Sequence, residues 1–150
     1  MEEGRLLGYI VSKYRVIIDS KRVVAIQNIP CPRNKKEVQS FMGKINFLRR
    51  FIPNLAKNMR LITNMLKKYE DIKWTVESRS SFENIKHAIR QSPILVIPDY
   101  TKYFIILSFS SEHTITKVLL QKNKDNQEQP IAFFSRALKD AELRYTTIEK

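Results

Sequence analysis

Apolar and polar positions in the first two thirds of the chain are spaced for short helices separated by polar and proline-containing segments. Ahead of these helices, residues 6–12 and 15–19 are rich in apolar and β-branched side chains, which predicts a β-hairpin. Each predicted helix has a polar residue that can cap its start and a residue at which it stops. The helices are expected from the cap Ser20 to before Pro30, from Lys35 after the cap Asn34 to about Phe51, from the cap Asn54 to Lys68, and from the cap Thr75 to Pro93.

The period of the pattern changes after Pro98 from helical spacing to strand spacing. Residues 103–109, 115–121 and 131–135 are dense in strand-forming side chains. The polar run 122–129 predicts a hairpin loop between the last two strands. We therefore predict an α+β fold, in which a small helical unit is followed by a three-stranded β-sheet.

The second predicted helix has two unlike sides when its residues are placed at intervals of about 100°. The apolar side, which is expected to be buried, contains Val38, Phe41, Ile45, Leu48 and Ile52. The opposite side contains Lys36, Gln39, Gly43, Phe47 and Arg50. Glycine inside a helix costs about 1 kcal/mol relative to alanine, so we expect another backbone to approach Gly43 closely. That backbone belongs either to a neighbouring helix packed on Gly43 and Phe47, or to a nucleic-acid duplex whose minor groove receives this side of the helix.

Positive charge is concentrated around the same helix. The net charge is +12, and residues 33–68 contain ten lysines and arginines with Glu37 as their only acid. One strongly basic segment in an otherwise nearly neutral chain indicates a polyanionic partner, although a solvated lysine-rich surface is the alternative interpretation. Phosphate contacts would give affinity without sequence preference. The cations expected to make them are Lys36, Lys44, Arg49 and Arg50.

Composition excludes several kinds of site. Cys31 is the only cysteine, so neither an internal disulfide nor a CxxC metal or redox site can form. His87 and His113 lie far apart in the chain, and no metal site is predicted. No apolar run approaches the roughly 18 residues of a membrane-spanning helix, so no membrane contact is expected. The acidic start after Met1 does not resemble a secretory signal, which predicts an intracellular protein, cytoplasmic or nuclear.

Several longer runs of residues, taken in order, resemble the reverse transcriptases of Ty3/gypsy-type retrotransposons. In the first half these runs are Leu7-Gly-Tyr-Ile-Val-Ser-Lys13, Pro32-Arg-Asn-Lys-Lys-Glu-Val-Gln-Ser-Phe-Met-Gly43 and Asn46-Phe-Leu-Arg-Arg-Phe-Ile-Pro-Asn54. In the second half they include Leu95-Val-Ile-Pro-Asp99, Gln129-Pro-Ile-Ala132, Ser135-Arg-Ala-Leu138 and Ala141-Glu-Leu-Arg-Tyr145. The runs extend over nearly the whole chain, so the resemblance covers all of the predicted units.

The resemblance implies four parts with different roles in the family. They are an end-of-palm hairpin at 1–18, a helical thumb at 19–68, a connector at 69–100 and a truncated RNase H-like domain at 101–150. The predicted fold is then a small helical thumb-like unit followed by a truncated RNase H-like three-stranded β-sheet. The thumb helix of the family follows the minor groove of the primer–template duplex, and the positions that do so match Gln39, Gly43 and Phe47.

The residues that carry catalysis in the family are not found at the matching positions. The Tyr-x-Asp-Asp turn of the polymerase does not occur in the chain. Counting back from Leu119-Leu-Gln121 places the first metal-binding aspartate of the nuclease at Phe109, which has no oxygen to bind Mg²⁺, the metal that the family uses. The next metal ligand of the family would follow Lys150. We therefore expect no catalytic residue and no cofactor, with Glu112 as a replacement ligand being the weaker alternative.

Three functional hypotheses follow. The first is a non-catalytic part of a retrotransposon Pol polyprotein that binds the backbone and minor groove of an RNA–DNA or DNA duplex. The second is a decayed or repurposed fragment that acts through protein–protein contacts, and the third is part of a longer active reverse transcriptase and ribonuclease H. Three strands without covering helices also predict self-association through an uncovered sheet face.

Overall fold

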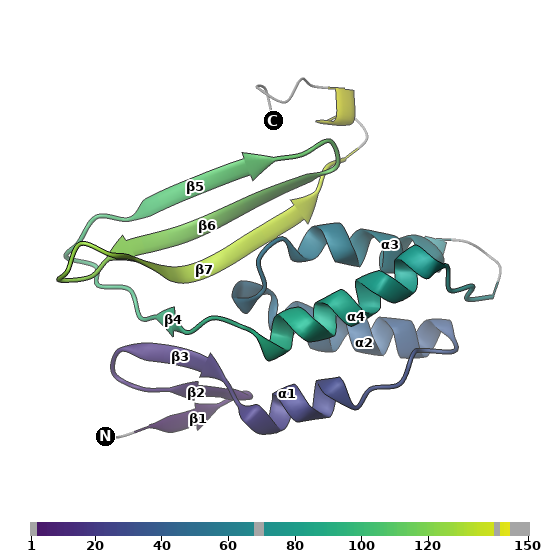
Figure 1. The fold of residues 1–150 in the computed structure, drawn as a ribbon, viewed down its shortest axis with the longest axis horizontal. Coiled ribbons are helices and arrows are strands. Elements are labelled where there is room, and N and C mark those ends of the chain that lie inside the picture. The colour runs from purple at the N-terminus through teal and green to yellow at the C-terminus, as the bar shows by residue number, and fades with distance from the viewer. Residues whose placement is uncertain (1–2, 68–70, 140–141, 145–150) are drawn as a thin grey trace.

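The computed structural model describes residues 3–67, 71–139 and 142–144. It contains four α-helices, two 3₁₀ turns and two antiparallel sheets, which confirms the predicted α+β class. In Figure 1 the helices lie to the right of the first sheet and below the right-hand end of the second. In chain order the elements are β1 (Gly4–Leu6), β2 (Tyr9–Val11), β3 (Arg15–Ile18), α1 (Ser20–Gln27), α2 (Lys35–Phe47), η1 (Arg49–Phe51), α3 (Leu55–Lys67), α4 (Val76–Arg90), β4 (Leu95–Val96), β5 (Ile105–Ser110), β6 (Thr114–Lys122), β7 (Glu128–Ala137) and η2 (Glu142–Arg144).

The first sheet has the strand order β1-β2-β3-β4. Its β2–β3 pair is the predicted hairpin, while β1 adds a strand through the turn at Leu7 and Gly8, where φ is 50° and 85°. The short β4 pairs with β3, since Leu95 lies opposite Val16. The segment assigned to the connector therefore returns to the hairpin assigned to the palm, and this long-range pairing was not predicted.

The helix starts follow local capping chemistry. Asn34 and Thr75 accept hydrogen bonds from backbone N–H groups of the first turns of α2 and α4, as predicted. The cap of α1 was predicted one residue too late, because Asp19 accepts from the Lys21 N–H at 3.0 Å and Ser20 is already helical. Asn54, the predicted cap of α3, has a φ of 52°, and its side-chain oxygen accepts from the Thr116 hydroxyl at 3.0 Å.

The main hydrophobic core lies among α2, α3 and α4 and extends to β3 and β4. Phe41 packs on Phe82 with ring centroids 4.8 Å apart. All five residues of the predicted apolar side of the second helix are buried, so that prediction is confirmed. The helix itself ends at Phe47 rather than near Phe51, and η1 continues the path in a tighter turn that still buries Phe51.

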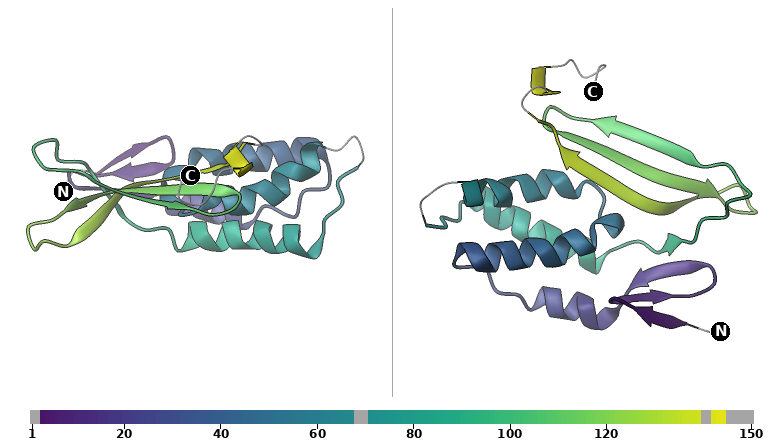
Figure 2. Two further views of the ribbon diagram at one scale, coloured as in Figure 1. Left: turned by 90° about the horizontal axis from the view of Figure 1, so that it is seen from above. Right: turned by 180° about the vertical axis from the view of Figure 1, so that it is seen from behind.

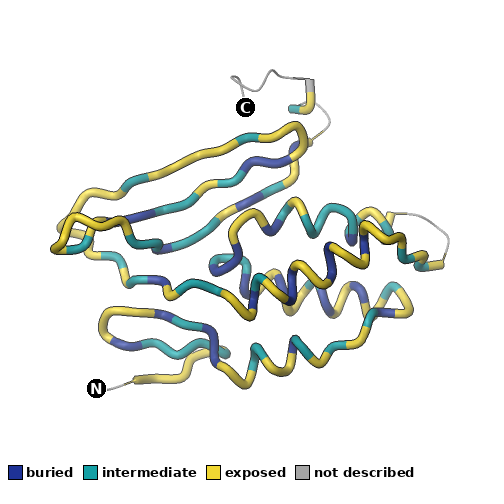
Figure 3. The backbone as a smooth tube through the Cα atoms, viewed as in Figure 1, coloured by how far each residue is buried: buried dark blue, intermediate teal, exposed yellow. Residues whose placement is uncertain are grey.

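The second sheet has the strand order β5-β6-β7 and confirms the three predicted strands; β6 and β7 are longer than predicted, while β5 begins two residues later than predicted and ends one residue later. Its strand β7 lies next to the helices and β5 lies on the far side (Figures 1 and 2). Figure 3 shows β5 exposed along most of its length. Ile106 is 65% exposed and Phe109 is 59% exposed. Because successive side chains of a strand alternate between the two faces of the sheet, these two side chains lie on opposite faces. Exposed apolar side chains are therefore not confined to one face of β5.

Among the described residues, no helix is both long and apolar enough to cross a membrane.

Candidate nucleic-acid interface

The outer side of α2 is open to solvent at the positions that the sequence singles out. Lys36, Gln39, Gly43 and Lys44 are all exposed. A Cβ atom added to Gly43 would meet no atom within 4 Å beyond the helix itself. Among the described residues, no neighbouring helix therefore packs on Gly43, which excludes helix packing as the reason for the glycine. The glycine leaves an uncovered stretch of helix backbone at the middle of this side.

Phe47 packs against the hairpin strand β2 and not against the neighbouring helix of the packing alternative. Its ring stacks on Tyr9 with centroids 5.2 Å apart and an interplanar angle of 6°. Tyr9 in turn stacks on Phe51 at 5.3 Å, and its hydroxyl donates to the Phe47 carbonyl. Phe47 remains 39% exposed, so an ordered ring still borders the open Gly43 side.

Arg22 completes this stack and was missed by the sequence analysis. Its guanidinium carbon lies 4.6 Å from the centroid of the Phe47 ring, a cation–π distance. Its Nη1 donates to the Leu7 carbonyl at 3.3 Å. A Cβ atom on Gly8 would lie 2.5 Å from Arg22 Nη1, so any larger residue at position 8 would clash with the arginine side chain in this position. No local sequence signal connects residues 8, 22 and 47, because only the fold brings them together.

Burial raises the pKa of Tyr9 above its ordinary value, while the positive charges of Arg50 and Arg22 act in the opposite direction. The phenol therefore stays protonated at neutral pH and keeps its donor role toward Phe47. Two cations beside a neutral hydroxyl leave the edge of this stack positively charged. This charge lies next to the open side of α2.

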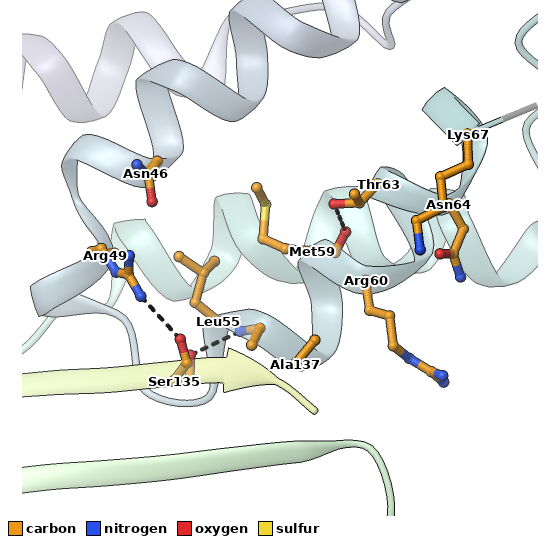
Figure 4. Close-up of a pocket in the computed structure, with 11 residues that line it drawn as sticks. Asn46, Arg49, Leu55, Met59, Arg60, Thr63, Asn64, Lys67, Ser135 and Ala137 are labelled. Carbon is orange, nitrogen blue, oxygen red and sulfur yellow. Dashed lines mark hydrogen bonds between the residues drawn. The ribbon is translucent and has the colours of Figure 1, made fainter. Parts of the chain in front are cut away.

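Arg49 and Arg50 occupy different surroundings although they are adjacent in sequence. Arg49 Nη2 donates to the Ser135 carbonyl at 3.1 Å (Figure 4), and its guanidinium lies 5.1 Å from the Phe134 ring centroid. Arg49 thus joins η1 to β7 instead of projecting from the open side of α2. Arg50 is half-buried over the ring of Phe51 and remains next to Tyr9.

A cavity of about 250 Å³ lies on the other flank of α2, between the end of that helix, α3 and β7. Leu55 and Met59 give it an apolar floor, and Arg60 and Lys67 reach it from α3 (Figure 4). The described α3 contains no acidic residue. Ser135 is fixed at this cavity because its hydroxyl accepts from the Ala56 N–H at 2.9 Å. Cations therefore flank the open side of α2 on both sides.

The position matched to the nuclease aspartate lies on β5, the strand of the second sheet on the far side from the helices. Phe109 borders a small pocket with Asn54 and Thr116, and no carboxylate lines it. Among the described residues, no group of three His, Cys, Asp or Glu is arranged to hold a metal ion. The side chains present at this position therefore do not fit Mg²⁺.

Comparison with known proteins identifies the family. Residues 74–150 match the family described as "RNase H-like domain found in reverse transcriptase". The chain belongs to this family. It is 36% identical over 150 residues to the retrovirus-related Pol polyprotein from transposon 297 of Drosophila melanogaster, covering 99% of this chain and 14% of that protein. It is 29% identical over 146 residues to the transposon Tf2-3 polyprotein of Schizosaccharomyces pombe, covering 97% of this chain and 11% of that protein.

These relatives confirm the Ty3/gypsy-type resemblance drawn from the sequence motifs. The chain spans about one seventh or less of the length of these curated relatives. Among solved structures, the foamy viral protease-reverse transcriptase in complex with dsDNA matches with a TM-score of 0.85 and 28% identity, covering 99% of this chain and 31% of that chain. The same enzyme in complex with an RNA/DNA hybrid matches with a TM-score of 0.83 and 31% identity, covering 99% and 20%.

Proposed function

We propose that the chain is a non-catalytic region of a retrotransposon Pol polyprotein, and that it binds a nucleic-acid duplex through the outer side of α2. The observation that carries the proposal is the open Gly43, where bare helix backbone is bordered by the ordered ring of Phe47. Similar structures of a foamy viral enzyme in complex with dsDNA and with an RNA/DNA hybrid support a duplex as the partner.

In this proposal the shape of the α2 surface and its charge have different roles in binding. Without a Cβ at Gly43, a sugar–phosphate edge can approach the helix closely, while Gln39 and Phe47 lie against the minor groove. Lys36, Lys44 and Arg22 then reach the phosphates on either side. Because phosphate contacts carry no base information, binding should depend on salt and on groove shape more than on sequence.

The site residues of the proposal differ from the sequence-based set in two ways. Arg22 is added, because it is held over Phe47 beside the open side. Arg49 is given the role of joining η1 to β7. The members retained are Lys36, Gln39, Gly43, Lys44, Phe47 and Arg50.

The proposal assigns no catalytic residue, metal or other cofactor to the chain. Phe109 supplies no oxygen at the position where the family binds its metal, and its pocket offers only hydroxyl, amide and backbone groups. An intracellular location, cytoplasmic or nuclear, accompanies this proposal as the compartment of its duplex partner. Metal-dependent cleavage of RNA in an RNA–DNA hybrid, abolished by Glu112→Gln, would contradict the non-catalytic assignment.

The decisive variant is Gly43→Leu. Leucine in an exposed helix interior should raise the free energy of unfolding by roughly 0.5–1 kcal/mol relative to glycine. The same side chain would block the approach of a duplex, so we expect at least a tenfold loss of affinity in fluorescence anisotropy with a blunt duplex. Asn84→Leu, on the exposed surface of α4, is the matched control and should leave affinity unchanged.

Charge variants give a second readout of the same site. Lys44→Gln should lower the slope of log affinity against log salt by about 0.9 for B-form DNA, which is the loss of one phosphate contact. Lys124→Gln, in the loop between β6 and β7, should leave the slope unchanged. Unchanged binding in Gly43→Leu together with an unchanged slope in Lys44→Gln would reject the proposed surface.

A further inference from the structure

Lys86 of α4 places a charged group inside the molecule, where only 8% of the residue is exposed. Its Nζ donates to the Gln27 carbonyl at 3.0 Å and to the Ile29 carbonyl at 2.6 Å. The same nitrogen lies 4.6 Å from the centroid of the Phe82 ring, a cation–π distance. Burying a charge costs free energy unless hydrogen bonds satisfy it, and the two carbonyls do so here. An apolar side chain would avoid that cost, so the lysine is best explained by the carbonyls that it holds.

The carbonyls that Lys86 binds lie at the C-terminal end of α1. Gln27 is the last residue of α1, and Ile29 follows two residues later. The last carbonyls of a helix have no partner within the helix, and a positive charge placed there also interacts favourably with the helix dipole. The contact is reciprocal, because Gln27 Nε2 donates to the Lys86 carbonyl at 2.7 Å. Lys86 and Gln27 together fasten the end of α1 to α4.

The short helix α1 depends on such attachments for its position. It has eight residues, whereas isolated helices shorter than roughly 12–15 residues are marginal in water. Within α1, all of which the structure describes, only Ile26 is buried. At the start of the helix, the N–H of the capping residue Asp19 donates to the Gly8 carbonyl at 3.0 Å. α1 is therefore attached to the hairpin at its start and to α4 at its end.

Arg22, the cation that lies over Phe47, is carried by this helix. Its guanidinium carbon lies 4.6 Å from the centroid of the Phe47 ring, which belongs to α2. The segment that leads into α2 has an anchor of its own, because Trp74 Nε1 donates to the Pro32 carbonyl at 2.6 Å. Loss of the Lys86 contacts should therefore loosen α1 while α2 stays in place.

We propose that Lys86 is a positioning residue of the duplex site: by holding the end of α1 on α4, it keeps Arg22 over Phe47, where the guanidinium can meet a phosphate. The inference rests on the proposed duplex binding and deepens it. Lys86 is buried, so it acts through Arg22 and not by touching the duplex. A phosphate-binding cation near the start of the chain then depends on the segment 74–150, which matches the RNase H-like family.

Lys86→Met tests the proposal in the free protein, because methionine keeps an apolar stem of similar length and removes both hydrogen bonds to α1. Nuclear Overhauser contacts between the Arg22 side chain and the Phe47 ring should weaken or vanish, while those within the core of α2, α3 and α4 persist. Arg90→Met, which removes a charge from an exposed position of the same helix, is the matched control and should keep both sets. Unchanged Arg22–Phe47 contacts in Lys86→Met would overturn the proposal.

A double-mutant cycle in duplex affinity separates positioning from general destabilisation. Arg22→Gln should weaken binding about threefold in the otherwise unchanged chain, the size of effect expected for one exposed charge pair. In the Lys86→Met background the same change should have almost no further effect, because Arg22 is already displaced. Lys44→Gln should weaken binding equally in both backgrounds, since Lys44 belongs to α2. An equal effect of Arg22→Gln in both backgrounds would overturn the proposal.

The same variants separate this inference from the duplex proposal. If neither Arg22→Gln nor Lys44→Gln weakens binding, the duplex site is rejected and the positioning role falls with it. If both weaken binding and Lys86→Met leaves the Arg22 effect intact, the positioning role alone is rejected.

Lys86→Gln decides the question if Lys86→Met does not fold. Glutamine is shorter than lysine but still offers a donor to the buried carbonyls, so it leaves fewer polar groups unsatisfied. We expect the Arg22–Phe47 contacts to weaken in this variant, and the effect of Arg22→Gln on affinity to shrink. Contacts and affinity effects equal to those of the unchanged chain would overturn the proposal.

Discussion

The region formed by α2, α3 and α4 and the sheet formed by β5, β6 and β7 are both rich in apolar residues, yet they bury them very differently. Val38, Phe41 and Ile45 of α2 have almost no exposed surface. Ile106 and Phe109 of β5 are mostly exposed. Sequence hydrophobicity alone does not separate the two regions. The difference lies in whether other elements of the described chain cover each apolar surface.

The comparison also separates two kinds of surface. The helical region keeps its apolar residues inside and presents cations around the open Gly43, which suits a polyanion. Strand β5 of the sheet contains no charged residue and leaves apolar side chains such as Ile106 and Phe109 exposed. The two regions therefore differ in how far their apolar side chains are buried and in their charge, and the following predictions test that difference.

The largest effect should come from the core of the helical region. Phe41→Ala should lower the free energy of unfolding by about 3–5 kcal/mol, because it removes a fully buried ring that packs on Phe82. Phe109→Ala, an aromatic truncation on β5, should change it by no more than about 0.5 kcal/mol. Urea denaturation of both variants provides the measurement. Similar losses in the two variants would mean that β5 contributes to one common core.

A smaller, regional effect is expected at the junction of the two regions. Arg49→Gln removes the hydrogen bond to the Ser135 carbonyl and the stacking on Phe134, so amide hydrogen exchange in β7 should accelerate while exchange in α4 stays unchanged. Duplex affinity should fall little. Arg50→Gln is the neighbouring control, for which β7 exchange should not change. A strong loss of duplex affinity in Arg49→Gln would show that Arg49 contacts phosphates, as the sequence analysis predicted.

The smallest effect concerns pH and the end of β7. Glu142 accepts hydrogen bonds from both terminal nitrogens of Arg136 and from the Lys139 N–H. The hydrogen bonds from Arg136, followed by that from Lys139, lower the pKa of Glu142 to about 2. Since this value lies below the unfolded value of about 4.3, the contact stabilises the fold above that pH and is lost as pH falls toward 2.

Carboxyl carbon chemical shifts in an NMR titration would follow this group directly. Glu142 should titrate near pH 2, and amide exchange at residues 136–139 should accelerate between about pH 4 and pH 2 after correction for intrinsic rates. In Glu142→Gln the same amides should exchange fast across the whole range. A Glu142 midpoint near 4.3 would show that the contact with Arg136 does not persist in solution.

Much of the helical region could be predicted because its signals are local. Asn34 and Thr75 lie at the right distance from the first turns they cap, and the apolar side of the second helix was correct at every position. The end of α2 was predicted too late because the apolar spacing continues past Phe47. Leu48 and Phe51 remain buried through the tighter turn of η1, so the pattern does not reveal the change.

The features that could not be predicted depend on long-range contacts. The pairing of Leu95 with Val16 joins segments far apart in the chain. The position of Arg22 over Phe47 depends on a turn at Gly8 that no helical pattern connects to either residue. Arg49 was assigned to phosphates on charge alone, although the fold turns it toward Ser135. Charge and periodicity locate a basic surface, but the fold decides which of its cations are available.

The central claim is that the duplex meets the outer side of α2, and backbone and side-chain NMR of the chain titrated with a short blunt duplex at low salt tests it most directly. The account predicts the largest shift changes at Gly43, at Phe47 and at the side-chain amide of Gln39, with β5 and β6 nearly unchanged. Shift changes concentrated on the second sheet, with Gly43 and Gln39 unaffected, would contradict it.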